Sequence, residues 1–179
     1  SVDYSQIELR VLAHLSKEEN LVKAFNNGED IHNSTAKLMY ETNEVSSEQR
    51  RIAKILNFGV LYGLGPHGVA QQTDLTREQG KQFIDLYFGK YPGIKDFQKL
   101  QIDSSKKTGY SKTLLGRRRY LEDINSPNAR IRGFAERIAI NMPIQGSAAE
   151  LIKIAMIDIY KKLAKEKLKA KMILQIHDE

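Results

Sequence analysis

EQRRIAKILNFGVLYG, residues 48–63, is the stretch with the strongest pattern in this sequence. Helix-forming residues run from Glu48 to Tyr62 and glycine follows, so the stretch predicts a helix. At about 3.6 residues per turn, side chains four positions apart lie on one stripe. Two cations followed by two aromatic rings form that stripe: Arg50, Lys54, Phe58 and Tyr62. Roughly opposite are aliphatic side chains that can pack into a core: Ile52, Leu56 and Val60.

The order of groups along this stripe matches the order of groups in a nucleotide. Cations bind phosphates, and aromatic rings pack against a sugar and a base. An amphipathic helix with solvated cations and core-packed aromatic rings fits the same spacing. The spacing alone therefore leaves both interpretations open.

Further helices are predicted on both sides of this stretch, with breaks at glycine and proline. Weaker β signals occur in three places: residues 110–114, 118–121 and 171–176. The helices are expected over residues 6–15, from a cap at 16–19 to 28, from Asp30 or Asn33 to 40, over 76–91, from there to about 107, and over 129–142 and 147–167, with a kink or boundary at Met142-Pro143. This order predicts an α+β fold: a small antiparallel sheet carrying the two chain ends, with a mainly helical insertion.

Composition places few limits on the partner but excludes several kinds of site. The 179 residues include 41% hydrophobic and 28% charged residues, and the net charge of +6 favours a polyanionic partner. The sequence has no cysteine, which excludes disulfides and cysteine-based metal or nucleophile sites. We found no apolar run long enough to span a membrane, and we expect a cytoplasmic protein.

Residues 50–63 resemble motif B of family A DNA polymerases, the bacterial polymerase I type, whose pattern is RRxxKxxNFGxxYG. All specified positions match: Arg50, Arg51, Lys54, Asn57, Phe58, Gly59, Tyr62 and Gly63. DYSQIELR at residues 3–10 is similar to motif A, and HDE at residues 177–179 is similar to motif C. The three motifs occur in the family's order. Segments 113–120 and 137–146 are also similar to the family, with one departure at Glu122, where proline is expected.

The resemblance implies template-directed DNA synthesis. A primer 3′-hydroxyl attacks the α-phosphorus of a deoxynucleoside triphosphate and pyrophosphate leaves, with two Mg²⁺ ions stabilising the attacking and leaving oxygens. By matching position, Asp3 and Asp178 are the principal catalytic metal ligands. The backbone carbonyl of Tyr4 is a further ligand, and Glu179 is an accessory carboxylate.

The resemblance also assigns residues to the incoming nucleotide: Gln6, Glu8, His32, Arg50, Lys54, Phe58 and Tyr62. Arg50, Lys54 and His32 are expected at the phosphates, and Lys54 is also the candidate to protonate departing pyrophosphate. Phe58 is expected at the sugar. Glu8 crowds the position of a ribose 2′-hydroxyl, which favours DNA over RNA synthesis.

Primer-template contacts are expected from a second stripe at four-residue spacing, Arg137, Asn141 and Gln145, which can donate to minor-groove acceptors common to all base pairs. His177 is expected at the primer end, and Tyr62 at the template base. The arginine cluster 117–119 either meets phosphates or forms a solvated basic turn.

In the terms of this family, residues 1–14 and 133–179 are expected to be palm, and residues 15–132 fingers. The thumb and the later palm strands are missing, so we expect a fragment of a monomeric polymerase that is inactive by itself. The first alternative is a non-catalytic helical nucleic-acid-binding module, which needs neither Asp3 nor Asp178. A single-subunit RNA polymerase is disfavoured by Glu8 and Phe58. A metal-dependent nuclease has no use for the nucleotide-binding stripe.

Overall fold

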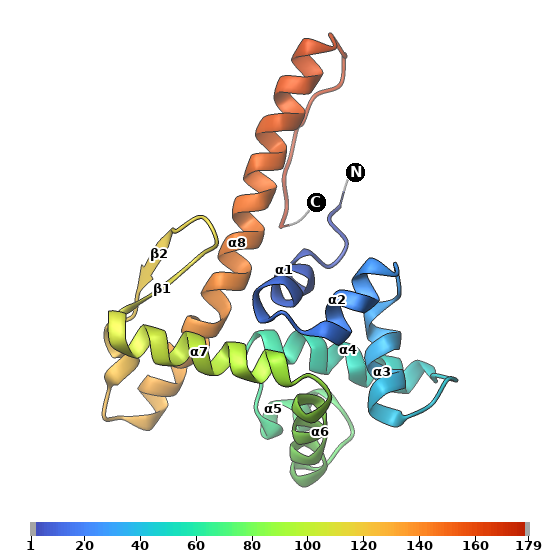
Figure 1. Cartoon of the computed structure of the whole chain (residues 1–179), viewed down its shortest axis with the longest axis vertical. Helices are drawn as coiled ribbons and strands as arrows, with labels where there is room; N and C mark the ends of the chain where they lie inside the picture. The colour runs from blue at the N-terminus through green and yellow to red at the C-terminus, as the bar shows by residue number, and fades with distance from the viewer. Residues whose placement is uncertain (1–2, 178–179) are drawn as a thin grey trace.

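The computed structural model describes residues 3–177 and is dominated by helices (Figure 1). In chain order the elements are α1 Ile7–Ser16, α2 Glu19–Asn26, α3 Ile31–Tyr40, α4 Ser47–Leu61, α5 Pro66–Gln72, α6 Arg77–Lys90, α7 Pro92–Thr108, β1 Tyr110–Lys112, β2 Arg118–Tyr120, the 3₁₀ turn η1 Glu122–Asn125 and α8 Ala129–Lys165. A short antiparallel pair of strands accompanies the helices, so the predicted α+β class is confirmed. None of the described helices is long and apolar enough to cross a membrane.

Helix starts follow the polar residues that the sequence offers as caps. The Asp30 carboxylate accepts hydrogen bonds from the backbone N–H groups of His32 (2.9 Å) and Asn33 (3.0 Å), which settles the start of α3. Thr76 and Gln79 form a reciprocal capping box at the start of α6. Such caps satisfy backbone donors that have no partner inside the helix.

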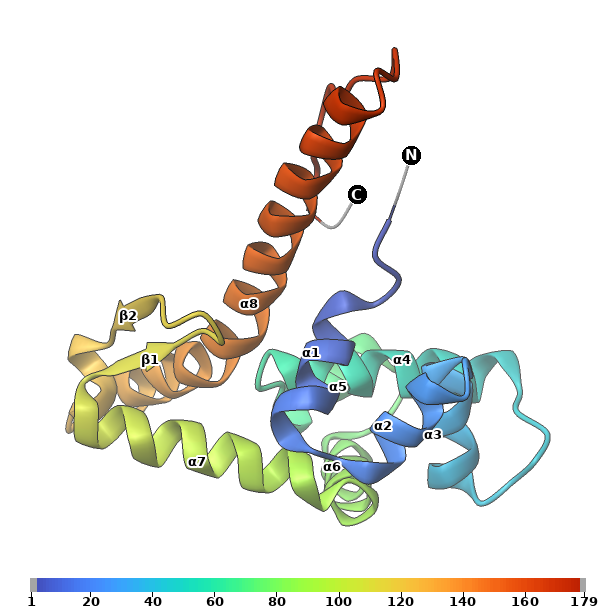
Figure 2. The ribbon, with the colours of Figure 1, turned by 45° about the horizontal axis from the view of Figure 1, so that its top comes forward.

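The main core lies where α1 meets the other helices. Leu9 and Leu12 of α1 are buried among side chains of α2, α4, α7 and α8. In Figures 1 and 2, α1 sits in the centre of the helical body and α3 lies to one side. In Figure 1, α4 runs from beneath α1 to α3, and α7 runs beneath α1 toward the hairpin. This packing puts the residues after the chain start beside the end of α4.

The hairpin pairs Tyr110 with Tyr120, and its turn contains Gly116, whose φ of 87° favours glycine. The sheet was expected to carry the chain ends, but among residues 3–177 it consists of β1 and β2, so that prediction is wrong for the described part of the chain. Residues 171–176, predicted as a strand, are extended without a ladder partner among residues 3–177, and Ile173 is 92% exposed. A strand forms only against a neighbour that supplies the other half of its backbone hydrogen bonds. The segment instead runs back along α8 (Figures 1 and 2).

A kink or a boundary was expected at Met142-Pro143. Pro143 lies inside one continuous helix, so there is no boundary. Proline has no N–H for the carbonyl four residues earlier. That carbonyl, of Ala139, accepts a hydrogen bond from Ser111 Oγ of β1 (3.0 Å). Ser147 accepts from the Leu114 N–H (2.9 Å) and donates to the Pro143 carbonyl. The hairpin therefore satisfies polar groups of the helix around Pro143, and α8 continues past this proline without ending. Figure 2 shows that α8 bends along its length.

Proline also explains two differences at other helix ends. Gly65 and Pro66 were predicted only to end a helix, but Pro66 begins α5, which was not predicted. Pro92 was predicted to stop one helix, and it also begins the next. The fixed φ of proline suits the first turn of a helix, where its missing N–H has no partner to lose.

Candidate functional site

Helix α4 has the two faces that its sequence predicts. Ile52 and Leu56 are buried, whereas Arg50 and Phe58 are half-buried and Lys54 is exposed. The side chain of Val60 lies outside what the structure describes. Tyr62, 40% exposed, follows the last residue of α4 and continues the stripe. The predicted stripe is therefore accessible along its length.

Arg50 at the start of the stripe is held by Asp30. Its Nε and one terminal nitrogen donate to the same Asp30 oxygen, Oδ2, at 3.2 and 2.7 Å. The other oxygen, Oδ1, caps α3. Burial would raise the pKa of Asp30, but the hydrogen bonds from Arg50 and from the two backbone N–H groups outweigh it and the pKa is lowered. One carboxylate thus ties the start of α3 to the stripe.

His32 lies next to this pair but is buried, at 3% exposure. Its ring contacts Phe58 (centroids 5.6 Å apart), and its Nε2 is 3.4 Å from the Gln6 amide nitrogen. Gln6 has a left-handed φ of 57° and makes no side-chain cap to α1. Non-glycine residues in this conformation are strained and are frequent at functional sites. The structure therefore brings Gln6, His32 and Phe58 together, with Gln6 and Phe58 both in contact with the His32 ring.

Asn57 was matched only as a motif position, and no role was predicted for its side chain. It is completely buried, and its Nδ2 lies 3.1 Å from His32 Nδ1. Asn57 lies on α4 one residue before Phe58 and away from the stripe. This position could have been used to predict from the sequence that its side chain is buried. Burial lowers the pKa of His32; Asp30 opposes this effect, and Arg50 adds to it.

Glu8 is the point where three segments meet. The Tyr62 hydroxyl donates to Glu8 Oε2 at 3.0 Å, and His177 Nε2 is 3.7 Å from Oε1. Glu8 is only 7% exposed. Burial, the charge of Glu8 and the bond to it raise the pKa of Tyr62, while a hydrogen bond with Gln145 opposes the rise. The segments that resemble motifs A and B and the residue before Asp178 therefore converge on one carboxylate.

The second predicted stripe lies on α8 around its bend. Arg137 and Gln145 are exposed, and Asn141 is half-buried with its Oδ1 unpaired among the described residues. A Cβ on Gly63 would lie 2.8 Å from Arg137 Cγ, so the end of α4 closely approaches this stripe. Together with the Gln145 contact to Tyr62, this approach joins the two stripes into one surface.

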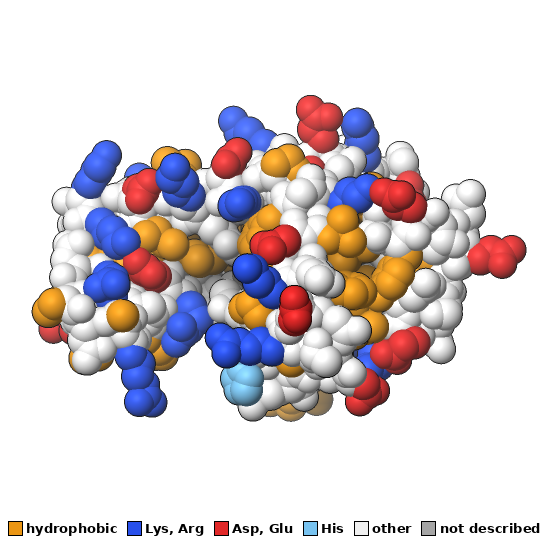
Figure 3. Space-filling view, turned by 90° about the horizontal axis from the view of Figure 1, so that it is seen from below, with side chains coloured by type: hydrophobic (Ala, Val, Ile, Leu, Met, Phe, Trp, Pro, Cys, Tyr) orange, Lys and Arg blue, Asp and Glu red, His pale blue; other side chains and the backbone are white. Residues whose placement is uncertain are grey.

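The arginine cluster 117–119 is organised by the hairpin. Arg117 Nε donates to the buried Glu150 of α8 at 3.1 Å. The Arg118 guanidinium lies 4.6 Å from the centroid of the Tyr110 ring. Figure 3 shows Lys and Arg side chains spread over the side of the molecule with the hairpin and α7, while acidic side chains gather toward the opposite side.

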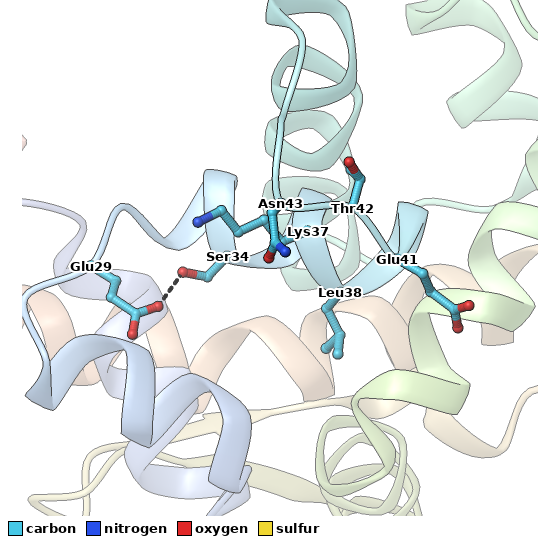
Figure 4. Close-up of a pocket in the computed structure, with 7 residues that line it drawn as sticks. All are labelled: Glu29, Ser34, Lys37, Leu38, Glu41, Thr42 and Asn43. Atoms are coloured by element: carbon cyan, nitrogen blue, oxygen red, sulfur yellow. Dashed lines mark hydrogen bonds between the residues drawn. The ribbon is translucent and has the colours of Figure 1, made fainter.

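Two of the shallow cavities on the described surface can be compared with the predicted site. One, of about 360 Å³, lies on the outer side of α3 and contains none of the predicted site residues (Figure 4). Its Glu29–Ser34 hydrogen bond of 2.6 Å closes one end. The other, of about 290 Å³, includes Gly63 and Arg137, where α4 approaches α8. The second cavity is therefore part of the joined surface.

The predicted metal ligands are only partly described. Asp3 and Tyr4 are exposed just before α1, and Asp178 and Glu179 lie outside the described residues. Within residues 3–177, no group of three acidic or histidine side chains could hold a metal. Carboxylate and carbonyl oxygens are the donors that Mg²⁺ prefers, so the chemistry of the predicted set fits this ion. The contact between His177 and Glu8 brings the two ends of the described chain together.

The family model described as DNA polymerase family A matches residues 1–179. The chain belongs to DNA polymerase family A. DNA polymerase I of Geobacillus stearothermophilus is 49% identical to it over 181 residues, and that of Streptococcus pneumoniae strain TIGR4 is 51% identical over 182 residues. Each match covers the whole chain and 21% of the relative. This family A chain thus spans about a fifth of the length of these relatives.

A solved structure described as the POL domain of Pol1 from M. smegmatis, in complex with DNA primer-template and dNTP, has the same fold as this family A chain. The TM-score is 0.94 at 43% identity, over 98% of this chain and 31% of that one. The resemblance seen in the motifs is therefore confirmed for the family and for the fold.

Proposed function

We propose that this chain forms the nucleotide-binding and part of the catalytic surface of a DNA-directed DNA polymerase. The observation that carries the proposal is the convergence on Glu8, where Tyr62 (3.0 Å) and His177 (3.7 Å) bring the three motif segments together. Residues 15–132 would act as fingers, and residues 1–14 and 133–179 as palm. Primer-template DNA and deoxynucleoside triphosphates are the proposed partners of a monomeric, cytoplasmic enzyme.

The stripe on α4 would bind the incoming nucleotide in the order of its chemical groups. Arg50 and Lys54 would bind the phosphates, and Lys54, which is exposed, would donate a proton to departing pyrophosphate. Phe58 would pack against the sugar. Glu8, held by Tyr62, would exclude a 2′-hydroxyl, because a buried carboxylate fixed from one side cannot move away without losing its donor.

Asp3, Asp178, the Tyr4 carbonyl and Glu179 would hold two Mg²⁺ ions. When bound, these ions stabilise charge on the attacking and leaving oxygens of the phosphoryl transfer. Arg137, Asn141 and Gln145 would donate to the minor groove of the primer-template, and His177 would contact the primer end. Tyr62, at the junction of the two stripes, would lie at the template base.

Primer extension in Mg²⁺ by a full-length polymerase that carries this sequence tests the proposal. Wild type is expected to extend with deoxynucleotides and not with ribonucleotides, and Asp178→Asn is expected to abolish extension. Asp3→Asn is the second variant that removes a carboxylate, and the same loss is expected from it. Binding of primer-template without extension by wild type would instead support the non-catalytic binding module.

A further inference from the structure

A buried hydrogen-bond network lies behind the nucleotide-facing side of α4. Asn57, Thr35, Tyr87 and Tyr91 come from α4, α3, α6 and the residue before α7. All four are at most 1% exposed. The polar atoms are mutually satisfied, with distances of 2.9–3.1 Å. None of the nucleotide contacts proposed for this chain involves these four side chains. Their role must therefore lie in the residue that the network contacts, which is His32.

The network fixes which way the Asn57 amide points. Burial raises the pKa of Tyr87 well above its usual range, so its hydroxyl keeps its proton and can donate. That hydroxyl lies 3.1 Å from Asn57 Oδ1. The Thr35 hydroxyl, 3.1 Å from Oδ1 and 3.0 Å from Nδ2, is compatible with either orientation of the amide. In the reverse orientation the Tyr87 hydroxyl would accept from the amide NH₂, and its own buried proton would have no acceptor among the described residues. The amide oxygen therefore faces away from His32.

With the amide so placed, its NH₂ group faces the imidazole. Asn57 Nδ2 lies 3.1 Å from His32 Nδ1, and a donor there requires that Nδ1 accept. The ring proton of a neutral histidine is then on Nε2. Burial lowers the pKa of His32, which keeps the ring neutral at physiological pH. The Gln6 amide nitrogen lies 3.4 Å from Nε2, and a 180° turn of this amide, which exchanges its nitrogen and oxygen, presents the amide oxygen to that N–H.

We propose that Asn57 is a positioning residue that holds His32 as the neutral Nε2–H tautomer, so that its single N–H donor points to the side where the phosphates of the nucleotide bind. The part about phosphates rests on the proposed function. A phosphate oxygen that displaces Gln6 would meet a donor already oriented, backed by a network that spans three helices. His32 would then bind a phosphate through one oriented N–H donor and not through the positive charge of a protonated imidazole.

The first test is the nitrogen NMR spectrum of ¹⁵N-histidine in a full-length polymerase that carries this sequence. The His32 signals are assigned by their loss in His32→Gln. We expect an unprotonated, pyridine-type Nδ1 and a protonated Nε2. A proton on Nδ1, or a doubly protonated ring at neutral pH, overturns the proposal. Because this result comes from the wild-type protein, it does not depend on the folding of any variant.

Asn57→Asp is the sharpest variant, because it keeps the shape and replaces the donor that faces Nδ1 by an acceptor. We expect the proton to move to Nδ1, and the KM for deoxynucleotides to rise about ten- to a hundredfold, as for loss of a hydrogen bond to a charged group. Asn33→Asp, the same change next to His32 on α3, is the control, with a spectrum like wild type and a KM within about twofold. An unchanged His32 spectrum in Asn57→Asp overturns the positioning role.

The kinetics of His32→Gln separate this proposal from the proposed function. If the spectra are as expected and His32→Gln leaves the KM for deoxynucleotides unchanged, the assignment of His32 to the phosphates is wrong, while the tautomer and its cause stand. If Asp178→Asn still extends primers, the proposed function itself is wrong, whatever the imidazole spectrum shows.

Discussion

Asp30 uses its two carboxylate oxygens for different contacts, and a pair of substitutions separates them. Asp30→Ala removes both the cap of α3 and the partner of Arg50. Asp30→Asn removes the charge but keeps an equally good capping group. Loss of an N-cap costs about 1 kcal/mol, within a range of about 0.5–2. The ion pair, whose side chains are 42% and 37% exposed, adds only about 0.2–1 kcal/mol after solvent screening.

We therefore expect Asp30→Ala to lower the free energy of unfolding by about 1–3 kcal/mol, and Asp30→Asn by less than about 1 kcal/mol. Urea unfolding followed by circular dichroism measures both. Arg50→Ala, which removes the pair but leaves the cap, is the matched control and should resemble Asp30→Asn. Equal losses from Asp30→Ala and Asp30→Asn would refute the assignment of the larger share to the cap.

Three further outcomes are expected. The pKa of Asp30 is lowered in the folded state, so its carboxylate stabilises the fold above the unfolded pKa of about 4. This stabilisation is lost as the pH falls through the lower folded pKa. A pH series of unfolding measurements on Asp30→Asn should lack this loss. Tyr62→Phe removes the donor to Glu8, and we expect discrimination against ribonucleotides to weaken by about tenfold or more in competition assays. Unchanged discrimination would show that the bond from Tyr62 to Glu8 has no part in excluding ribonucleotides. Gly63→Ala should destabilise the protein by about 1–2 kcal/mol in thermal unfolding, because φ is 66° and the new Cβ would press on Arg137.

The isolated 179-residue chain is expected to show no primer extension, even where the polymerase that carries it is active. Residues 171–176, which lead toward motif C, have no strand beside them within the described residues, so no ladder fixes this extended segment. Extension by the purified chain, measured in Mg²⁺ against an Asp178→Asn control, would contradict this expectation.

Sequence patterns predicted the helices well because their signals are local. The cap at Asp30 and the two-sided pattern of α4 depend on residues a few positions apart. The predicted strand at 171–176 failed for the opposite reason: its apolar run satisfies β propensity, but pairing depends on a partner elsewhere. Pro143 could be identified from sequence, but the serine in the hairpin that bonds the carbonyl left free by this proline could not.

The candidate site was predicted residue by residue, but not its connections. The family resemblance placed Glu8, Tyr62 and His32 in the site. The spacing of these residues in the sequence does not predict the bond between Glu8 and Tyr62 or the burial of His32. The role of Asn57 depends on a hydroxyl thirty positions away, at Tyr87. Long-range contacts of this kind leave no periodic signal, and only the folded structure supplies them.

The bond from Ser111 to the Ala139 carbonyl has a consequence for how template and primer would be held. Arg137 and Asn141 precede Pro143, and Gln145 follows it, so the three donors lie on both sides of the proline in α8. The course of α8 through this proline therefore sets their relative spacing. Because Ser111 and Leu114 of the hairpin bond to α8 on either side of Pro143, the hairpin would help to set the distance between the base pairs that these donors contact.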